Sequence, residues 1–295
     1  MGFRVCAALI LSLSLAIATP PALSSATNAA VPKASDPLGV ARIIRGASVQ
    51  GRTLEVVRIG HPVIGKSVLV VGCIHGTECA GLPVIDALRH DPRAQQLGIW
   101  VLPNLNPDGY AAGTRGNARG VDLNRNSLWH WLPKPGRGDQ QYTGRFPLSE
   151  PESRFATKVI RKLQPRVTIW LHQPIGLIDL SGGLARVERC YAKLVGMPVK
   201  QLERFNGSLV SWQNDTFPGS TAFVVEIPPG PLASTGIALH DTAAVALARS
   251  PTAAVCSLQD QLIAAAAAPL ESRATLSLSG GASAPARGGQ AHRVH

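Results

Sequence analysis

Acidic residues are scarce in this sequence, in which 18 Asp and Glu stand against 29 Lys and Arg and leave a formal net charge of +11. A positive balance of this size favours an anionic partner or surface. The basic residues are scattered, however, and the sequence contains no Lys/Arg-rich run and no nucleic-acid-binding motif. We therefore expect no nucleic-acid partner and predict electrostatic association with an anionic cell wall.

Long apolar runs are also lacking beyond the N-terminal segment. No later stretch reaches the ~20 apolar residues that a membrane-spanning helix needs, so we expect no membrane span. Charged residues make up 16% of the chain and hydrophobic residues 45%. This composition excludes wholesale disorder and is sufficient for the core of one sizeable domain.

The N-terminal segment has the order of a secretory signal peptide. Arg4 precedes an apolar run over residues 5–18, and small residues follow at 24–26. A charged region, an apolar region and a small-residue cleavage site predict a signal peptide over 1–26. A retained N-terminal anchor is the alternative, but the apolar run is short for a membrane span. We predict a secreted or periplasmic protein.

Cysteine is scarce as well. Cys6 lies in the predicted signal peptide, and the four cysteines that remain, Cys73, Cys79, Cys190 and Cys256, allow three disulfide pairings. Cys73 and Cys79 lack the second Cys/His pair of a zinc finger. They are interpreted as core thiols or disulfide partners.

Composition divides the rest of the chain into three parts. Residues 27–38 are small and Pro-containing and predict a linker, whereas 269–295 are rich in Ser, Ala, Gly and Arg and predict a disordered tail. The folded domain is expected over 39–268. Within it, apolar runs predict strands and periodic segments predict helices in alternation, which indicates an α/β sheet with helices on both faces. The strands are expected at 54–59, 67–74, 99–102, 167–171 and 222–227, and the helices at 79–90, 149–163 and 236–268, the last interrupted by Pro251. Ser149 is predicted to cap the second helix, with Glu152 completing a capping box.

Ionisable residues follow three of the predicted strands. His75 and Glu78 come after the second strand, His172 directly follows the fourth, and Glu226 lies near the end of the fifth. Because working residues in α/β sheets lie at the carboxyl edges of the strands, these side chains are expected to lie close together. Buried ionisable groups need compensation. A zinc ion held by two imidazoles and one carboxylate, with one open position, would supply it.

Two longer motifs lie between these residues. Asn106-Pro107-Asp108-Gly109 is followed by Arg115 and by Gly120-Val121-Asp122-Leu123-Asn124-Arg125-Asn126. With the residues at the strand ends, this order resembles the M14 family of zinc metallocarboxypeptidases over about 66–232. The resemblance implies a three-layer α/β/α sandwich with a mixed, mostly parallel central sheet. It also implies that His75, Glu78 and His172 bind one Zn²⁺ per chain and that Glu226 is the general base.

The same resemblance assigns the remaining site residues. Arg115 takes the position of the arginine that polarises the scissile carbonyl, and Asn124 and Arg125 take the positions that hold a peptide's free C-terminal carboxylate. Asp122 is interpreted as a structural partner of a ligand histidine. Arg119 is interpreted as a solvated surface residue.

The segments around His172 and Glu226 and the nine-residue step from Arg115 to Asn124 resemble the compact bacterial branch of the family. That branch includes murein peptide amidases, which cut cell-wall peptides before diaminopimelate. The expected function is therefore a secreted zinc carboxypeptidase that removes a C-terminal residue, with cell-wall peptides as one substrate class. A zinc-dependent deacylase of N-acyl amino acids and a catalytically inactive cell-wall-binding protein are the alternatives.

The residues that select the substrate are expected within 176–220. Candidates for the specificity pocket are Asp179, Arg204, Trp212 and Asp215. Pancreatic-type members carry a mobile tyrosine in this part of the chain. The only tyrosine here, Tyr191, stands at an unlike position beside Cys190 and is given no role.

Overall fold

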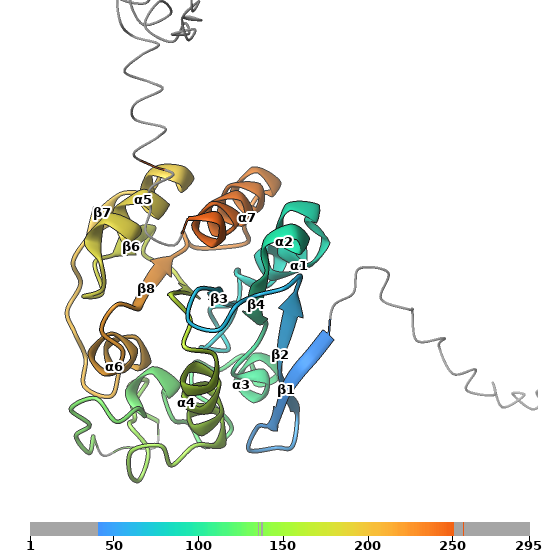
Figure 1. Ribbon diagram of the computed structural model, residues 1–295. Coiled ribbons are helices and arrows are strands. Elements are labelled where there is room, and N and C mark those ends of the chain that lie inside the picture. Colours follow the sequence, from blue (N-terminus) through green and yellow to red (C-terminus); the bar gives the residue numbers. More distant parts are fainter. Residues whose placement is uncertain (1–40, 135, 137, 251–255, 257–295) are drawn as a thin grey trace, which may run out of the picture. The chain divides into compact units, whose positions relative to one another are not determined.

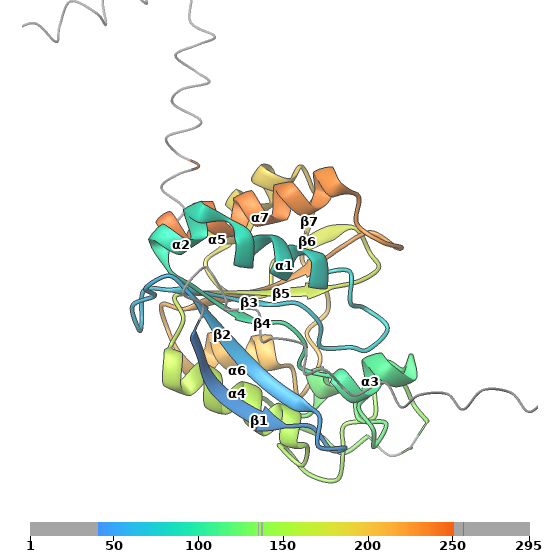
Figure 2. The same ribbon diagram turned by 90° about the vertical axis from the view of Figure 1, so that its right-hand side faces the viewer.

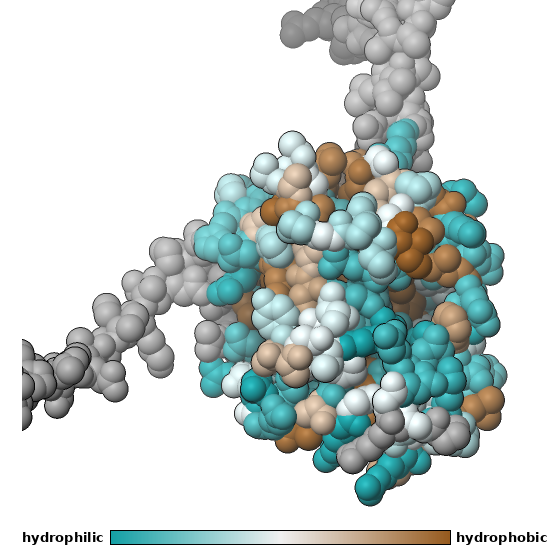
Figure 3. Space-filling model, turned by 180° about the vertical axis from the view of Figure 1, so that it is seen from behind, coloured by the Kyte–Doolittle hydropathy of each residue, from teal (hydrophilic) through white to brown (hydrophobic). Residues whose placement is uncertain are grey.

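The computed structural model describes residues 41–134, 136, 138–250 and 256 of the 295-residue chain. The predicted signal peptide, linker and tail lie outside the described residues. No helix among those residues is long and apolar enough to cross a lipid bilayer. On the face seen in Figure 3, hydrophobic residues are separated by hydrophilic ones.

The described chain is built on one sheet of eight strands in the order β1-β2-β4-β3-β5-β8-β6-β7 (Figure 1). Strands β4, β3, β5 and β8 are parallel neighbours in the middle of the sheet, and antiparallel pairs occur toward both edges. The mixed sheet of the expected α/β fold is thereby confirmed. The strands span Ala41–Ala47 (β1), Thr53–Ile59 (β2), Val68–Val71 (β3), Ile99–Leu102 (β4), Val167–His172 (β5), Leu177–Asp179 (β6), Val199–Lys200 (β7) and Thr221–Glu226 (β8).

Helices cover both faces of the sheet, so the three-layer arrangement is also confirmed (Figures 1 and 2). One face carries α1 (Leu82–His90), α2 (Pro92–Leu97), α5 (Ala185–Val195) and α7 (Ser234–Arg249). The other face carries α4 (Pro151–Leu163) and α6 (Leu209–Thr216). A short helix, α3 (Pro107–Ala112), and a 3₁₀ turn over Leu123–Arg125 lie in the connection between β4 and α4.

The alternation of side chains along the central strands decides which residues reach the site. In β5, Ile169 and Leu171 pack in the core beneath α1, α5 and α7, whereas Trp170 packs on the α4 and α6 face. His172 follows with the period of two that a strand imposes, so it points to the same face as Trp170. Its partner in the ladder is Glu226 of β8. Two ionisable residues therefore end neighbouring parallel strands side by side.

The beginning of α4 differs from its prediction. The helix begins at Pro151 with Glu150 as the N-cap, and no side chain caps it. The Ser149 hydroxyl donates to Glu150 Oε1 at 2.7 Å, and Glu152 Oε1 accepts from the amide of Val49 at 2.9 Å. Both groups of the expected capping box therefore have other partners. The helix predicted from residue 79 likewise begins later, at Leu82, because the preceding residues form the turns of the site.

Two disulfides select one of the three possible cysteine pairings. Cys73 is bonded to Cys79, and Cys190 in α5 is bonded to Cys256. The first closes a loop that contains His75 and Glu78. The second attaches α5 to the chain beyond α7.

Candidate active site

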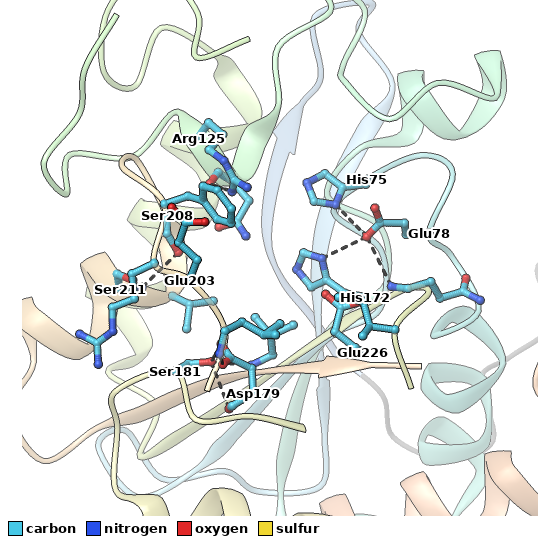
Figure 4. Close-up of a pocket in the computed structure, with 18 of the residues that line it drawn as sticks. His75, Glu78, Arg125, His172, Asp179, Ser181, Glu203, Ser208, Ser211 and Glu226 are labelled. Carbon is cyan, nitrogen blue, oxygen red and sulfur yellow. Dashed lines mark hydrogen bonds and ion pairs between the residues drawn. The ribbon is translucent and has the colours of Figure 1, made fainter. Parts of the chain in front are cut away.

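Three side chains converge on one point at the carboxyl edge of the sheet. Glu78 Oε2 lies 2.9 Å from Nδ1 of His75 and 3.1 Å from Nδ1 of His172 (Figure 4). One ligand atom from each of the three residues lies within 4.8 Å of the others, and all three residues are buried. The turn after β3 brings His75 and Glu78 together because the Glu78 amide donates to the His75 carbonyl at 2.9 Å. Nitrogen and carboxylate donors in this arrangement can hold a divalent metal.

Burial and hydrogen bonding act in opposite directions on this cluster. Burial disfavours the charged form of Glu78, but hydrogen bonds with His172 and His75 outweigh burial and hold the pKa of the carboxyl well below its usual range. For His75, burial alone would lower the pKa, but Asp122 and Glu78 raise it. The cluster therefore provides an ionised carboxylate, as metal binding requires.

Asp122 occupies the outer side of His75. Its Oδ1 lies 2.9 Å from His75 Nε2, the ring nitrogen that faces away from Glu78. When Nδ1 binds a metal, Nε2 carries the proton and donates it to Asp122, which fixes the tautomer and the orientation of the ring. Asp122 is completely buried, and its interactions with His75 and Arg115 overcome burial and hold its pKa below the usual range. The predicted contact between Asp122 and a histidine of the candidate metal site is thus present.

Glu226 lies beside the cluster at the end of β8. Its side chain is 8% exposed, and Oε2 has no hydrogen-bond partner among the described residues. Burial raises the pKa of this carboxyl, against the influence of nearby His172. A carboxyl group with a raised pKa and a free oxygen at the edge of a metal cluster can exchange a proton with a bound substrate or water.

Arg115 is held at the cluster by acidic side chains and by the Asn-Pro-Asp-Gly motif. Its guanidinium pairs with Glu78 Oε1 and with Asp122 Oδ2, the latter at 3.1 Å from Nη2. Its carbonyl accepts from Asn106 Nδ2 at 3.0 Å and from the Gly76 amide at 3.2 Å. Asn106 also caps α3, where its Oδ1 accepts from Gly109. The motif therefore positions the arginine and does not enter the pocket.

Asn124 and Arg125 form another wall of the site. The Arg125 guanidinium stacks 4.1 Å above the Phe205 ring and donates through Nη1 to the Asn124 carbonyl at 2.9 Å. Its buried Nε has no hydrogen-bond partner among the described residues. Asn124 Oδ1 accepts from the amide of Leu209 at 3.0 Å, which fixes the orientation of the side-chain amide. This wall therefore presents guanidinium donors in a fixed position.

These residues surround a pocket of about 280 Å³. Of the four candidates for substrate selection, Asp179 and Arg204 line it. Trp212 and Asp215 do not: Trp212 is buried against Phe217, and Asp215 is exposed outside the pocket. Both belong to α6, a helix that was not predicted. Further lining residues that the sequence did not single out include Ser181, Leu202, Phe205, Ser208 and Ser211.

Other predicted assignments agree with the structure. Arg119 is a surface residue whose Nη1 lies 3.4 Å from Glu150 Oε2. Tyr191 lies in the core, 1% exposed, with its hydroxyl 2.8 Å from His240 Nδ1. It lines no part of the pocket, in agreement with the absence of an assigned role.

Comparison with known proteins places this site in a family. Residues 33–178 match the sequence profile of the zinc carboxypeptidase family, Peptidase_M14. Murein peptide amidase A of Escherichia coli (strain K12) is 29% identical over 125 residues, which cover 39% of this chain and 52% of that protein. Murein peptide amidase A of Vibrio campbellii is 26% identical over 174 residues, covering 55% and 69%. The chain thus spans about half the length of the Escherichia coli protein that it matches.

Solved structures give a concordant result. Murein-tripeptide amidase MpaA from Escherichia coli O157 superposes with a TM-score of 0.58 at 25% identity, over 74% of this chain and 96% of that one. Thrombin activatable fibrinolysis inhibitor, at 17% identity and a TM-score of 0.60, shares the fold. The profile match ends before Glu226, which the sheet nevertheless places beside the matched cluster. The chain belongs to the zinc carboxypeptidase family.

Proposed function

We propose that this protein is a zinc-dependent carboxypeptidase that removes the last residue of a peptide. The observation that carries the proposal is the position of Glu226 in the same pocket as the cluster of His75, Glu78 and His172 and the Arg125 wall. A metal site, a proton-transfer group and a carboxylate-binding group therefore share one pocket. A zinc-dependent carboxypeptidase needs these three functions.

The donor set fits zinc. Two imidazole nitrogens and a carboxylate oxygen are typical of catalytic zinc sites, which keep one position for water or substrate. The zinc ion, one per chain, would be held by His75, Glu78 and His172. When bound, it lowers the pKa of a coordinated water towards ~7 and polarises a carbonyl group.

The protein side chains supply the remaining steps. Glu226 accepts a proton from the attacking water and delivers it to the nitrogen of the leaving amine, because it lines the pocket, its Oε2 has no hydrogen-bond partner among the described residues, and its pKa is raised. Arg115 donates hydrogen bonds to the carbonyl oxygen as negative charge develops on it. With Tyr191 in the core, Glu226 performs both proton transfers.

The Arg125 wall explains why such an enzyme would cut at a chain end. A guanidinium binds a carboxylate through two parallel hydrogen bonds, and Asn124 adds an amide donor. A peptide whose terminal carboxylate lies against Arg125 has its last peptide bond near the metal cluster. Internal bonds lack that carboxylate and are not positioned.

We propose cell-wall peptides that contain diaminopimelate as the substrate class. Two relatives carry the name murein peptide amidase A. The pocket supports a polar side chain, because Asp179, Ser181 and Arg204 line it.

We also propose export of the protein, for which the order of residues 1–26 is the support. Its net charge of +11 would hold it at an anionic cell wall. Retention on purified walls should then fall along a salt series, and salt-independent retention would count against this association.

The proposed reaction is tested by measuring zinc content and peptide hydrolysis together. We expect wild-type protein to hold one zinc and to trim a single C-terminal residue. Glu226→Gln should keep its zinc and lose roughly 10²–10⁴-fold in kcat. A deacylase would instead cleave acyl-amino acids and ignore peptides. A protein that binds no zinc and cleaves no peptide would favour a binding role. A Glu226→Gln variant with wild-type turnover would refute the role given to Glu226.

A further inference from the structure

We propose that the specificity pocket recognises a side chain that ends in both an ammonium and a carboxylate, with Asp179 binding the ammonium and Arg204 the carboxylate. This inference rests on the proposed carboxypeptidase function and assigns the residues that would choose its substrate. A diaminopimelate side chain has such an end, whereas lysine and aliphatic side chains do not.

The pocket contains more charged groups than the reaction needs. The cluster, Glu226 and the arginines Arg115 and Arg125 are accounted for by metal binding, proton transfer and carboxylate binding. Three charged lining residues remain: Asp179, Glu203 and Arg204. Glu203 lies toward Arg125, whose charged form it stabilises (Figure 4). Asp179 and Arg204 are therefore the pair that a substrate side chain can use.

Asp179 is oriented but not neutralised. Its Oδ1 accepts from the Leu202 amide at 2.7 Å, and its Oδ2 accepts from the Ser181 hydroxyl at 2.7 Å. No Lys, Arg or His nitrogen of the described residues lies within 4.0 Å of it. In Figure 4, Asp179 and Ser181 lie across the pocket from Arg125. A peptide held by Arg125 at its terminal carboxylate can thus direct its side chain toward Asp179.

Arg204 is an exposed residue at the rim of the pocket and has no carboxylate partner among the described residues. Its guanidinium packs against Gly182, where an added Cβ would lie 2.1 Å from Nη2 and would displace the guanidinium. The backbone there has φ +89°, which also favours glycine. Arg204 and Asp179 line the same pocket. Burial raises the pKa of the Glu188 carboxyl; Asp179 adds to this rise and Arg204 opposes it. The free guanidinium suits a carboxylate, which it can bind through two hydrogen bonds.

The two charges together select a zwitterionic end. A lysine ammonium would satisfy Asp179 but would lie near the positive charge of Arg204. A side chain with a carboxylate alone would satisfy Arg204 but would lie near Asp179. An aliphatic side chain would leave both charged groups without a partner while it displaced their water, which is unfavourable. Only a side chain with both charges pairs each group.

Four peptides that differ in their last residue test this assignment: diaminopimelate, 2-aminopimelate, lysine and norleucine. In that order, their last side chains end in both an ammonium and a carboxylate, in a carboxylate alone, in an ammonium alone and in no charged group. We expect wild-type kcat/KM to be highest on the diaminopimelate peptide. Relative to the norleucine peptide, Asp179→Asn should lower selectivity for diaminopimelate and lysine by roughly 10- to 100-fold, the range for a hydrogen bond to a charged group. Arg204→Gln should lower selectivity for diaminopimelate and 2-aminopimelate by a similar factor.

Matched controls are Asp215→Asn and Arg189→Gln, which remove the same charges at exposed positions outside the pocket. Neither should change the order of the four substrates. Equal kcat/KM of wild type on diaminopimelate and norleucine, or an equal loss on all four peptides in Asp179→Asn, would overturn the assignment while leaving the carboxypeptidase function intact. A zinc-loaded wild type that cleaves none of the four peptides would instead overturn the carboxypeptidase function itself.

Discussion

Asp122 links a predicted metal ligand to the predicted carbonyl-polarising arginine: its Oδ1 lies 2.9 Å from Nε2 of His75, and its Oδ2 lies 3.1 Å from Nη2 of Arg115. The Asp122 carboxylate is completely buried, so solvent does not compete with either partner. One side chain therefore sets the orientation of both groups, and changing it should affect metal binding and catalysis together.

Asp122→Asn should lower zinc affinity about 10- to 100-fold, because an amide accepts the His75 proton less strongly and supports the wrong tautomer about as well. Competition with a chelator at neutral pH would measure this. The matched control is Asp108→Asn, since Asp108 is also buried but binds Ser48, Gln50 and Arg52. Equal zinc affinities of the two variants would contradict the role given to Asp122.

Glu188 should make folding stability depend on pH. Burial raises its pKa from 4.5 to about 7. Between these values the folded state binds more protons than the unfolded state, so the free energy of unfolding falls as pH rises through the window. The loss amounts to roughly 3 kcal/mol at 1.36 kcal/mol per pKa unit. Glu188→Gln should therefore gain stability relative to wild type between pH 4.5 and 7, measured by denaturant unfolding. Parallel pH curves for the two proteins would show that the idea is wrong.

Gly207 should be required for carboxylate binding. An added Cβ at this position would lie 1.9 Å from the carbonyl oxygen of Arg125, and the backbone has φ +76°. Gly207→Ala should displace Arg125 and raise KM for peptides with a free C-terminus about tenfold or more. Gly196→Ala is the control, because its φ is +68° but nothing lies within 4 Å. That change should cost only stability, about 1 kcal/mol, and similar KM values in both variants would contradict the prediction.

The two disulfides should have different effects when removed. Cys190 and Cys256 are 66 residues apart, and the chain-entropy model gives about 4 kcal/mol of unfolding free energy for a loop of that size. Cys73 and Cys79 are six residues apart, for which the model gives about 2 kcal/mol. Denaturant unfolding of the two double alanine variants would compare them. A larger loss in the Cys73→Ala/Cys79→Ala variant would contradict this order.

The short disulfide should matter more for the metal. His75 and Glu78 both lie between Cys73 and Cys79, so the bridge restricts the loop that carries two of the three predicted ligands. The Cys73→Ala/Cys79→Ala variant should bind zinc more weakly, and the Cys190→Ala/Cys256→Ala variant should not. Metal titration of both folded variants would decide, and equal affinities would contradict the prediction.

The sequence predicted the centre of this molecule better than its edges. β4, β5 and β8 are buried along their whole length and are mainly apolar, so their runs stood out within one or two residues. The edge strand β1 contains Arg42 and Arg45, and β6 has only three residues, so neither gave an apolar run. The capping box at Ser149 did not form, because the Ser149 hydroxyl binds the neighbouring Glu150 carboxylate and the Glu152 carboxylate binds the amide of Val49.

The sequence likewise predicted some residues of the candidate site and missed others. Residues that follow apolar strands were predicted because sheet topology brings strand ends together, and motif order supplied the others. The pocket lining depends on how residues 173–220 fold back over the sheet, and no local pattern encodes that path. Asp179 and Trp212 therefore looked equally suitable in the sequence, although one lines the pocket and the other is buried beside it.

His172 and Glu226 occupy opposite positions in the ladder between β5 and β8. Their separation is therefore fixed by strand spacing, whatever the length of chain that joins them. The residues expected to choose the substrate lie on that joining segment. Longer or different loops in this segment can change which peptide is cleaved while His172 and Glu226 keep their positions. Deleting one residue within β8, in contrast, would turn Glu226 to the opposite face of the sheet. The architecture thus lets new substrates evolve without reinvention of the chemistry.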